Sequence, residues 1–358
     1  MNEIVKQRIR AFSLLGAYMR DAMQDPGFRQ VSRKAQGGNV FFLPAYVDRA
    51  VRVWGEALTE ENLGLWLEPY RFADLGSHKT VALVMAGNIP LVGFHDYLCA
   101  LLCGMDVQVK LSSKDAHLLP FLHAKLLELV SGEEMQEGMP VGGRLEFPAV
   151  GCIPSVAFTK DTVHGFDAII ATGSGNTFRY FEYYFGRYPH LLRRNRSSCA
   201  VLDGTESEDD LAGLADDALS YFGLGCRNVS KLFVPEGYDF ASFMRALLPL
   251  SSFSASLAAY KDNYDYHKAV YLVDRLEFLD NGSALLLPSA GLASPMSVLY
   301  YEYYQDRESL ERRLSLMEGG LQCVAGKGRV PFGTVQSPGL ADYADGVDTL
   351  AFLLGLGG

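Results

Sequence analysis

The chain has few of the features that mark secreted, membrane or metal-binding proteins. Only 6 of its 358 residues are Cys, they form no CxxC pair, and they show no metal-like spacing with the 7 His. No uninterrupted apolar run is long enough to span a bilayer. The N-terminal stretch MNEIVKQRIRAF carries charges throughout, unlike a secretory signal. We therefore expect a cytoplasmic protein with free thiols, no membrane span and no metal.

Basic residues are also scarce, with 32 Lys and Arg against 42 Asp and Glu and a formal net charge of −10. Because a phosphate backbone is bound by clustered cations, this balance argues against a nucleic-acid partner. The one basic cluster is Arg193, Arg194 and Arg196, with Arg187 nearby. We interpret it as a solvated helix end or loop. The alternative is a local site for the phosphates of CoA or a cofactor.

The composition and length indicate a fully folded chain with two cores. Apolar residues make up 49% and charged residues 21%, which is ordinary globular usage, and the length is about twice that of a usual single domain. We expect a helical lead-in and cofactor-binding domain at residues 1–196 and a catalytic domain at residues 197–335. Residues 336–358 would form a tail that packs back on the core or on a neighbouring subunit.

Alternating strand and helix patterns predict an α/β fold with parallel sheets. Helical spacing of apolar residues predicts an amphipathic lead-in from Asn2 to about Ala35. Ser112 and Ser113 are candidates to cap the helix that carries Leu118 and Leu126. Predicted strands lie at residues 79–86, 107–111, 168–171, 198–202 and 231–234, and predicted helices lie at residues 91–105, 178–185 and 211–222. Helices between successive strands imply parallel pairing with right-handed crossovers.

Four local features carry potential chemistry, and the first is Cys226 in the run YFGLGCRNVSKLFVP. The cysteine lies between a predicted helix end and a predicted strand, where a substrate could reach it. Helix-terminal amides and Arg227 would lower the pKa of its thiol and raise the thiolate fraction. The alternative is a buried cysteine in a tight turn, which is the commoner outcome for a lone Gly-Cys pair.

The other three features lie at the ends of predicted strands, where ligands bind in open α/β sheets. Asn88 in GNIP could donate to a developing oxyanion, or it could simply belong to a turn. Lys110 precedes two hydroxyls, and its alternative is a solvated lysine before an ordinary helix cap. The small residues Gly173 and Ser174 before a helix would let phosphate or ribose approach the backbone. The segment has neither a GxGxxG nor a Walker pattern.

Taken together in this order, the features resemble the aldehyde dehydrogenase superfamily, most closely its acyl-CoA reductase branch, the fatty-acid reductase component of bacterial luminescence systems. The resemblance runs from about Lys79 to the C-terminus. It rests on the separated motifs MAGNIPLVGF, VQVKLSS, IIATGSGNTFRYF, RRNRSSCAVLDG, YFGLGCRNVSKLFVP, LASPMSVLYYE and PFGTVQSPGLADYADGVDTLAFL. It implies two Rossmann-related domains with parallel sheets and an active-site cleft between them.

The resemblance also implies roles for individual residues. Cys226 matches the catalytic cysteine, and Asn88 matches the asparagine that completes the oxyanion hole. The implied cofactor residues are Lys110 for the adenosine ribose, with Ser112 and Ser113 beside it, Gly173 and Ser174 for the pyrophosphate, and Pro295 near the nicotinamide ribose.

Two departures from the hydrolytic members of the family shape the expected activity. No carboxylate stands between Glu182 and Asp203, where those enzymes keep a Glu base, so an S-acyl intermediate would lack a base to activate water. The loop GLASP lacks the Glu that contacts the nicotinamide ribose in the hydrolytic enzymes. Ser113 stands where NAD-selective relatives have an acid, so NADPH should be accepted, with NADH possible.

The sequence therefore predicts NAD(P)H-dependent reduction of an acyl-CoA, of fatty acyl type, or of an acyl-protein, to the aldehyde through an S-acyl-Cys226 intermediate. One alternative is an oxidative (semi)aldehyde dehydrogenase. Another is a non-catalytic nucleotide-binding subunit of an acyl-transferring complex. We expect a homo-oligomer, with an acyl-transferring or acyl-activating enzyme as a further partner.

Overall fold

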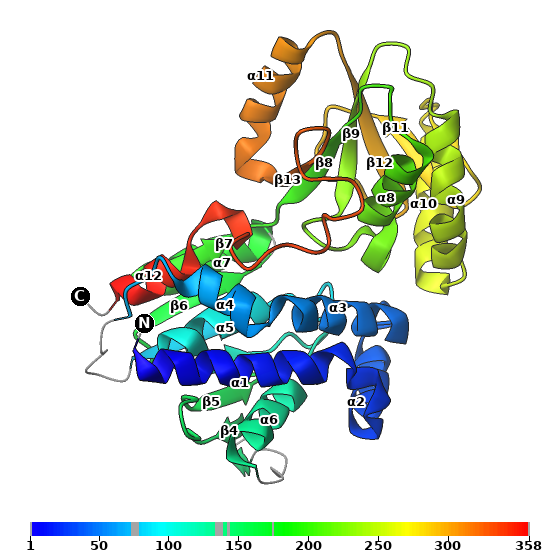
Figure 1. The fold of residues 1–358 in the computed structure, drawn as a ribbon. Coiled ribbons are helices and arrows are strands. Elements are labelled where there is room, and N and C mark those ends of the chain that lie inside the picture. Colours follow the sequence, from blue (N-terminus) through cyan, green and yellow to red (C-terminus); the bar gives the residue numbers. More distant parts are fainter. Residues whose placement is uncertain (1, 73–78, 133–138, 142–143, 174, 357–358) are drawn as a thin grey trace. The chain divides into compact units, whose positions relative to one another are not determined.

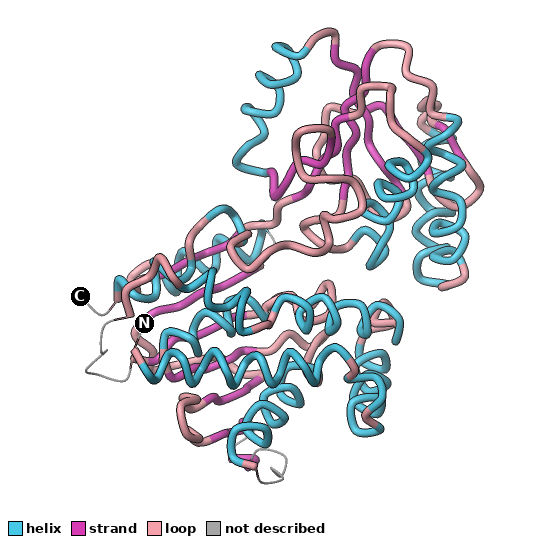
Figure 2. Tube along the Cα trace, in the orientation of Figure 1, coloured by secondary structure: helices cyan, strands magenta, loops and turns pink. Residues whose placement is uncertain are grey.

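The structure is a computed structural model that describes residues 2–72, 79–132, 139–141, 144–173 and 175–356. The chain forms two compact units, residues 1–194 together with 339–358, and residues 195–338 (Figure 1). Each unit is built around a mostly parallel sheet with helices beside it (Figure 2). The predicted α/β class with parallel sheets is confirmed.

The first unit contains a seven-stranded sheet in the order β3-β4-β5-β2-β1-β6-β7. The neighbouring strands in the run β5-β2-β1-β6-β7 pair in parallel, whereas β4 is antiparallel to both β3 and β5. The bounds are β1 Thr80–Val84, β2 Asp106–Lys110, β3 Met139–Val141, β4 Arg144–Phe147, β5 Val156–Thr159, β6 Ala168–Thr172 and β7 His190–Arg193.

The predicted N-terminal lead-in is helical but not continuous. It consists of α1 (Glu3–Arg20) and α2 (Pro26–Gly38), separated by a 3₁₀ turn. The break follows from capping, because the Asp25 side chain accepts a hydrogen bond from the Gly27 N–H and Pro26 begins the second helix. The other helical elements of this unit are α3 Pro44–Ala57, α4 Glu60–Leu67, α5 Phe94–Cys103, α6 Leu118–Ser131, α7 Gly175–Phe185, η4 Ala344–Gly346 and α12 Thr349–Gly355.

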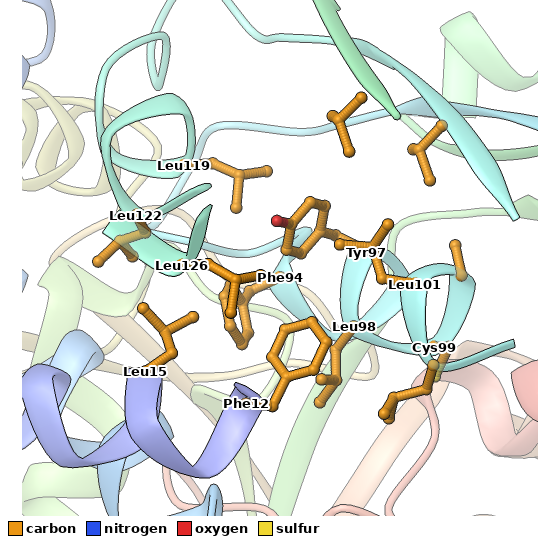
Figure 3. Close-up of a cluster of buried hydrophobic side chains, with 14 of the residues drawn as sticks. Phe12, Leu15, Phe94, Tyr97, Leu98, Cys99, Leu101, Leu119, Leu122 and Leu126 are labelled. Atoms are coloured by element: carbon orange, nitrogen blue, oxygen red, sulfur yellow. The ribbon is translucent and has the colours of Figure 1, made fainter. Parts of the chain in front are cut away.

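The core of the first unit joins α1 to the helices that flank the sheet. Phe12 and Leu15 point from α1 toward the side chains of α5 and α6 (Figure 3), and both are fully buried. Tyr97 of α5 lies in the same cluster, and its hydroxyl is 2.6 Å from Nδ1 of His123 on α6. The lead-in thus contributes directly to the core of this unit.

The C-terminal segment belongs to the first unit and is tied to it by Arg193. Arg193 is buried, donates to the Asp96 carboxylate at 2.7 Å and to the Thr349 hydroxyl at 2.8 Å, and also donates to the Ala344 carbonyl. The interpretation of Arg193 as part of a solvated basic cluster is therefore wrong, because its charge is neutralised internally. Leu350 and Leu353 of α12 are fully buried in the core of this unit.

The second unit contains a six-stranded sheet in the order β10-β11-β12-β9-β8-β13, parallel except for the short β10. Ala200 and Leu232 pack with α8 and α9 on one face, and Cys199 and Phe233 pack with α11 on the other. The elements are β8 Ser197–Val201, α8 Glu208–Leu219, η2 Ser220–Gly223, β9 Val229–Pro235, α9 Ala241–Ala255, α10 Ala258–Val273, β10 Leu279–Asp280, β11 Leu285–Pro288, β12 Val298–Tyr304, α11 Arg307–Met317, η3 Glu318–Gly320 and β13 Leu321–Gly326. Within the described parts of the chain, no helix combines the length and apolarity that a membrane crossing requires.

Candidate active site

Three of the predicted site residues lie at one edge of the first unit's sheet. Lys110 ends β2, Asn88 follows β1 and Gly173 follows β6, and these strands are neighbours in the order β2-β1-β6. The connection from β1 leads to β2 on one side, whereas β6 pairs with the other side of β1. Ligands of open α/β sheets bind at such a divergence, outside the carboxyl ends of the strands.

Asn88 lies in a loop whose shape is held at both ends. Leu91 adopts a left-handed backbone conformation with a φ of +58°, which costs a non-glycine residue about 1–2 kcal/mol. Its N–H donates to Oδ2 of Asp115 at 2.9 Å. At the other end, Nδ2 of Asn39 donates to the Gly87 carbonyl at 3.3 Å. Asn88 itself is half-buried.

The loop that follows β2 packs directly against this segment. A Cβ atom at Gly87 would lie 2.5 Å from Oγ of Ser112 and 3.2 Å from the backbone N of Asp115. Only glycine permits so close an approach. Ser112 therefore packs directly against the loop that carries Asn88.

The prediction that Ser112 or Ser113 caps the next helix is wrong. Helix α6 begins at Leu118, and its N-cap residue, His117, makes no side-chain capping bond. Ser112 Oγ instead accepts from the Lys114 N–H at 3.2 Å, and Ser113 is exposed. The assignment of both serines to the cofactor stays a prediction.

Two further lysines lie near the loop that follows Lys110. Its Nζ donates to the backbone carbonyl of Lys160 at 3.2 Å, and Lys160 follows β5 at the same sheet edge. Burial, and then the positive charges of Lys160 and Lys34, lower the pKa of His117. Sequence reasoning missed Lys160 and Lys34, because they are far from Lys110 along the chain. The available signal was that Lys160, like Lys110, stands at the end of a short apolar run.

Gly173 lies where a side chain would collide with helix α7. A Cβ atom there would be 2.7 Å from the Phe181 ring and 3.1 Å from Cβ of Thr177. The Gly173 N–H donates to the Arg193 carbonyl at 3.2 Å, which extends the pairing of β6 with β7. Ser174, the other predicted pyrophosphate residue, lies outside the described residues.

Cys226 lies in an irregular, half-exposed segment between α8 and β9 of the second unit. Helix α8 ends at Leu219, before the predicted end at Phe222, because Tyr221 and Phe222 have φ values of +51° and +60°. Both aromatic side chains are buried. Two consecutive left-handed aromatic residues are strained, and the surrounding contacts must hold them.

Asn228 bonds to the backbone on both sides of these two residues and was not singled out by the sequence. It is buried, and its Nδ2 donates to the Ser220 carbonyl at 2.8 Å and to the Asp217 carbonyl at 3.0 Å. Its Oδ1 accepts from the Gly225 N–H at 2.8 Å. One amide side chain thus fastens both the helix end and the residue before Cys226.

Asp217 continues this network into the motif PFGTVQSPG. Its carboxylate is fully buried and accepts the backbone N–H of Gly333 at 2.7 Å and of Val335 at 3.1 Å. Gly213 of the same helix approaches Gly333 so closely that a Cβ atom would lie 2.9 Å from its backbone N. The Cys226 segment and the 331–336 loop therefore share one support at the end of α8.

A second thiol lies close to the backbone of Cys226. Ser198 is fully buried, its Oγ donates to the Cys226 carbonyl at 3.0 Å, and the same oxygen is 3.1 Å from Sγ of Cys323. Cys323 is also half-buried. Within the described residues, no group of three or more His, Cys, Asp and Glu could hold a metal ion.

The structure also joins the predicted Pro295 loop to the strand that follows Cys226. Ser230 Oγ donates to the Leu292 carbonyl at 2.8 Å, and Nζ of the fully buried Lys231 donates to the Ser289 carbonyl at 2.9 Å. Ser230 and Lys231 belong to β9, a few residues after Cys226. The second unit therefore brings two predicted functional segments together.

Comparisons with known proteins find the same fold in solved structures. The indole-3-acetaldehyde dehydrogenase of P. syringae in complex with NAD⁺ and IAA aligns with a TM-score of 0.57 and 12% identity, over 90% of this chain and 71% of that one. Aldehyde dehydrogenase 21 from Physcomitrella patens, in complex with the reaction product succinate, gives 0.59 and 13%, over 90% and 73%. An NAD-dependent benzaldehyde dehydrogenase from Corynebacterium glutamicum gives 0.57 and 12%, over 90% and 75%.

No protein-family model matches the chain, and no curated protein matches it by sequence. At identities of 12–13% the solved structures establish the fold alone. The chain has an aldehyde-dehydrogenase-like fold, as the sequence motifs imply.

Proposed function

We propose that the protein is a nicotinamide-dependent oxidoreductase that interconverts an aldehyde and an acyl group held as a thioester on Cys226. The observation that carries this proposal is the supported position of Cys226, which is half-exposed on a strained segment that Asn228 fastens on both sides. A cysteine with a purely structural role would be buried in apolar packing. The support holds the thiol in one place, which nucleophilic attack on a carbonyl requires.

The sheet edge of the first unit fits a dinucleotide cofactor. Gly173 lets the end of β6 pack closely against α7, where a side chain would collide with Phe181, and Lys110 provides a cation at the end of β2. The charges of Lys160 and Lys34, which act on His117 in the loop after Lys110, suit the 2′-phosphate of NADPH better than the free ribose hydroxyls of NADH. When bound, the nicotinamide supplies or accepts a hydride at the carbonyl carbon. The roles of Ser112, Ser113 and Pro295 in holding it are part of this proposal.

We assign Asn88 to the carbonyl oxygen. An amide donor fixed on a rigid loop stabilises the oxyanion that forms when the thiolate adds to the carbonyl, and such a donor contributes about 3 kcal/mol. The bonds from Asp115 and Asn39 to the two ends of the loop supply the required rigidity. The Cys226 thiolate forms the C–S bond, and the departing group, CoA in the reductive direction, leaves as a thiolate.

Acyl-CoA reduction is the direction that the sequence before Asp203 favours. The stretch from residue 183 to residue 202 contains no carboxylate, and the strand β7 within it ends on the internally paired Arg193. Without a base on this stretch, water is a poor nucleophile toward the thioester. The acyl group would then leave by hydride transfer or by return to CoA.

Oxidation of an aldehyde is the second candidate, and the fold comparison favours it. The three solved structures described above are aldehyde dehydrogenases, and two of them are NAD⁺-bound or NAD-dependent by name. Both directions pass through the same S-acyl cysteine. They differ in whether water removes the acyl group.

One experiment separates the two directions. The purified protein is mixed with short, medium and long acyl-CoA plus NADPH or NADH, and in parallel with the matching aldehydes plus NADP⁺ or NAD⁺, and nicotinamide absorbance is followed. Consumption of NADPH with release of aldehyde supports reduction. Formation of free acid from aldehyde at a comparable rate would assign the protein as an oxidative dehydrogenase. Absence of turnover in every combination would overturn the proposed function.

A further inference from the structure

Two loops with different proposed roles are packed as one body in the first unit. The segment 86–91 carries Asn88, and the segment 110–117 carries Lys110, Ser112 and Ser113. Gly87 lies against Ser112 so closely that no side chain fits between them, and the Met85 N–H donates to the Lys110 carbonyl at 3.1 Å. The two loops therefore touch along their length.

We propose that Asp115 is a positioning residue that couples these loops, so that a cofactor held by the 110–117 loop also orders the loop that carries Asn88. The inference rests on the proposed function, because it takes Asn88 as the oxyanion donor and Lys110 as a cofactor residue. It assigns Asp115 no contact with substrate or cofactor. Its role is to fix the distance and orientation of one loop relative to the other.

The surroundings of Asp115 support this role. The side chain is only 9% exposed, although it lies on a loop whose neighbours Ser113 and Lys114 are exposed. Its Oδ2 accepts the Leu91 N–H at 2.9 Å, and its backbone N lies against Gly87. Burial raises the pKa of the carboxyl to about 6, while the backbone N–H groups of Leu91 and Leu118 favour the charged form. The carboxylate is thus charged at pH 7.5, where it accepts its bonds most strongly.

Leu91 shows why an anchor is needed. A leucine with a φ of +58° would relax to an ordinary conformation if its N–H lost its acceptor, because the left-handed form costs about 1–2 kcal/mol. That relaxation would move the peptide groups between Gly87 and Leu91. Asn88 lies among them.

Hydrogen exchange tests the coupling directly. Amide exchange of peptides covering 86–92 and 110–117 is measured at pH 7.5 with and without NADPH, in the wild type, Asp115→Ala and Asp115→Asn. In the wild type NADPH should slow exchange in both peptides. In Asp115→Ala the 86–92 peptide should exchange faster without cofactor and gain no protection with it, and Asp115→Asn, which keeps an acceptor for Leu91, should protect this peptide at least as well as the wild type does. Unchanged exchange of 86–92 in Asp115→Ala overturns the proposal.

A second pair of variants keeps the test independent of Asp115 if Asp115→Ala does not fold. Gly87→Ala would force Ser112 away and should raise exchange in both peptides together, whereas Gly64→Ala, where a Cβ atom meets nothing within 4 Å, should change neither. Faster exchange in only one of the two peptides of Gly87→Ala would contradict a coupled pair.

The acylation step gives the catalytic readout. The rate of S-acylation of Cys226 by acyl-CoA is measured by intact-protein mass spectrometry. In Asp115→Ala this rate should fall about 10- to 100-fold, which is a fraction of what loss of an oxyanion donor costs. The KM for acyl-CoA should be unchanged. In an Asn88→Ala background the Asp115→Ala change should have no further effect. A full additional loss there overturns the coupling. Absence of S-acylation in the wild type would instead count against the proposed function, and the exchange data without cofactor would still decide the role of Asp115.

Discussion

At the scale of single residues, Cys226 and Cys323 form a natural comparison. Both thiols are half-buried, and Ser198 contacts the segments of both. Only Cys226 lies on the strained segment held by Asn228, so Cys226→Ala should abolish S-acylation and turnover, by about 10⁴-fold or more, while Cys323→Ala keeps most of both. Intact-protein mass spectrometry after mixing with acyl-CoA provides the measurement. An acyl adduct that survives in Cys226→Ala and disappears in Cys323→Ala would reverse the assignment.

The buried carboxyl of Asp115 also leads to a prediction about how the free energy of unfolding depends on pH. Its pKa is raised by burial from 3.8 to about 6, so between these values the folded protein holds a proton that the unfolded chain releases. The free energy of unfolding therefore falls as pH rises through this window, by about 3 kcal/mol in total at 1.36 kcal/mol per pKa unit. Asp115→Asn removes this dependence.

The variant should match the wild type near pH 4 and exceed it by up to about 3 kcal/mol at pH 7, as measured by urea unfolding at a series of pH values. The control Asp262→Asn changes an exposed carboxylate and should shift neither end of the curve. A difference between Asp115→Asn and wild type that does not grow with pH would show that the carboxyl does not titrate in this range.

The charge of Lys160 leads to a prediction about the choice between NADPH and NADH. If its charge recognises a 2′-phosphate, Lys160→Ala should weaken NADPH binding about tenfold or more, the effect of a charge-assisted hydrogen bond of about 1.5–3 kcal/mol, and leave NADH binding nearly unchanged. Fluorescence titration of the reduced cofactors measures both. Lys110→Ala should weaken both cofactors, because a cation on the adenosine ribose serves each. Equal losses for NADPH and NADH in Lys160→Ala would remove it from the phosphate site.

At the scale of elements, the segment between α8 and β9 depends on one side chain. Asn228→Ala would remove the bonds of this side chain to four backbone groups of the segment, at a cost of about 1–3 kcal/mol, and should slow Cys226 acylation at least about tenfold. Asn263→Ala is the matched control, because its amide donates to one helical carbonyl only. Denaturant unfolding and the acylation assay supply the two readouts. Equal effects of the two variants would argue against a special role for Asn228.

The sequence predicted the strands and helices well wherever apolar periodicity was strong, and less well at their ends. The strand at Lys231–Val234 and the helix at 211–222 are present within a few residues. The end of that helix was misplaced because buried packing of Tyr221 and Phe222 overrides their backbone preference. The cap at Ser112 was wrong because an aspartate three residues later lies closer to the first helical turn.

The sequence could predict only those residues of the candidate site that belong to a recognisable local motif. Cys226, Asn88 and Lys110 each stand beside a strand and could be proposed as site residues from local patterns. Asp115 and Lys160 make contacts with residues distant along the chain, and the bonds of Asn228 reach back to the end of α8, up to 11 residues away. No local pattern reports such contacts.

At the scale of the whole molecule, the chain leaves the first unit after Arg194 and returns to it at Gly339. The last helix therefore stabilises the unit that carries the proposed cofactor residues Lys110 and Gly173 rather than the unit that precedes it in sequence. Its anchors are Leu350 and Leu353, both fully buried, and the Thr349 hydroxyl that accepts from Arg193. Substitutions that disrupt α12 should therefore destabilise the first unit.

A double variant, Leu350→Ala with Leu353→Ala, tests this arrangement. Each truncation of a buried leucine costs about 2–5 kcal/mol, so hydrogen exchange in the β1, β2 and β6 peptides should accelerate strongly while β9 and β12 of the second unit keep their protection. Leu316→Ala, at a site 81% exposed, serves as the control and should alter neither unit. NADPH binding should weaken in the double variant because Lys110 and Gly173 lie on the destabilised sheet edge. Iodoacetamide labelling of Cys226, which belongs to the second unit, should proceed as in the wild type. If β9 and β12 lose protection to the same extent as β1, the two units unfold as one cooperative body, and the returning helix stabilises the whole chain rather than the first unit.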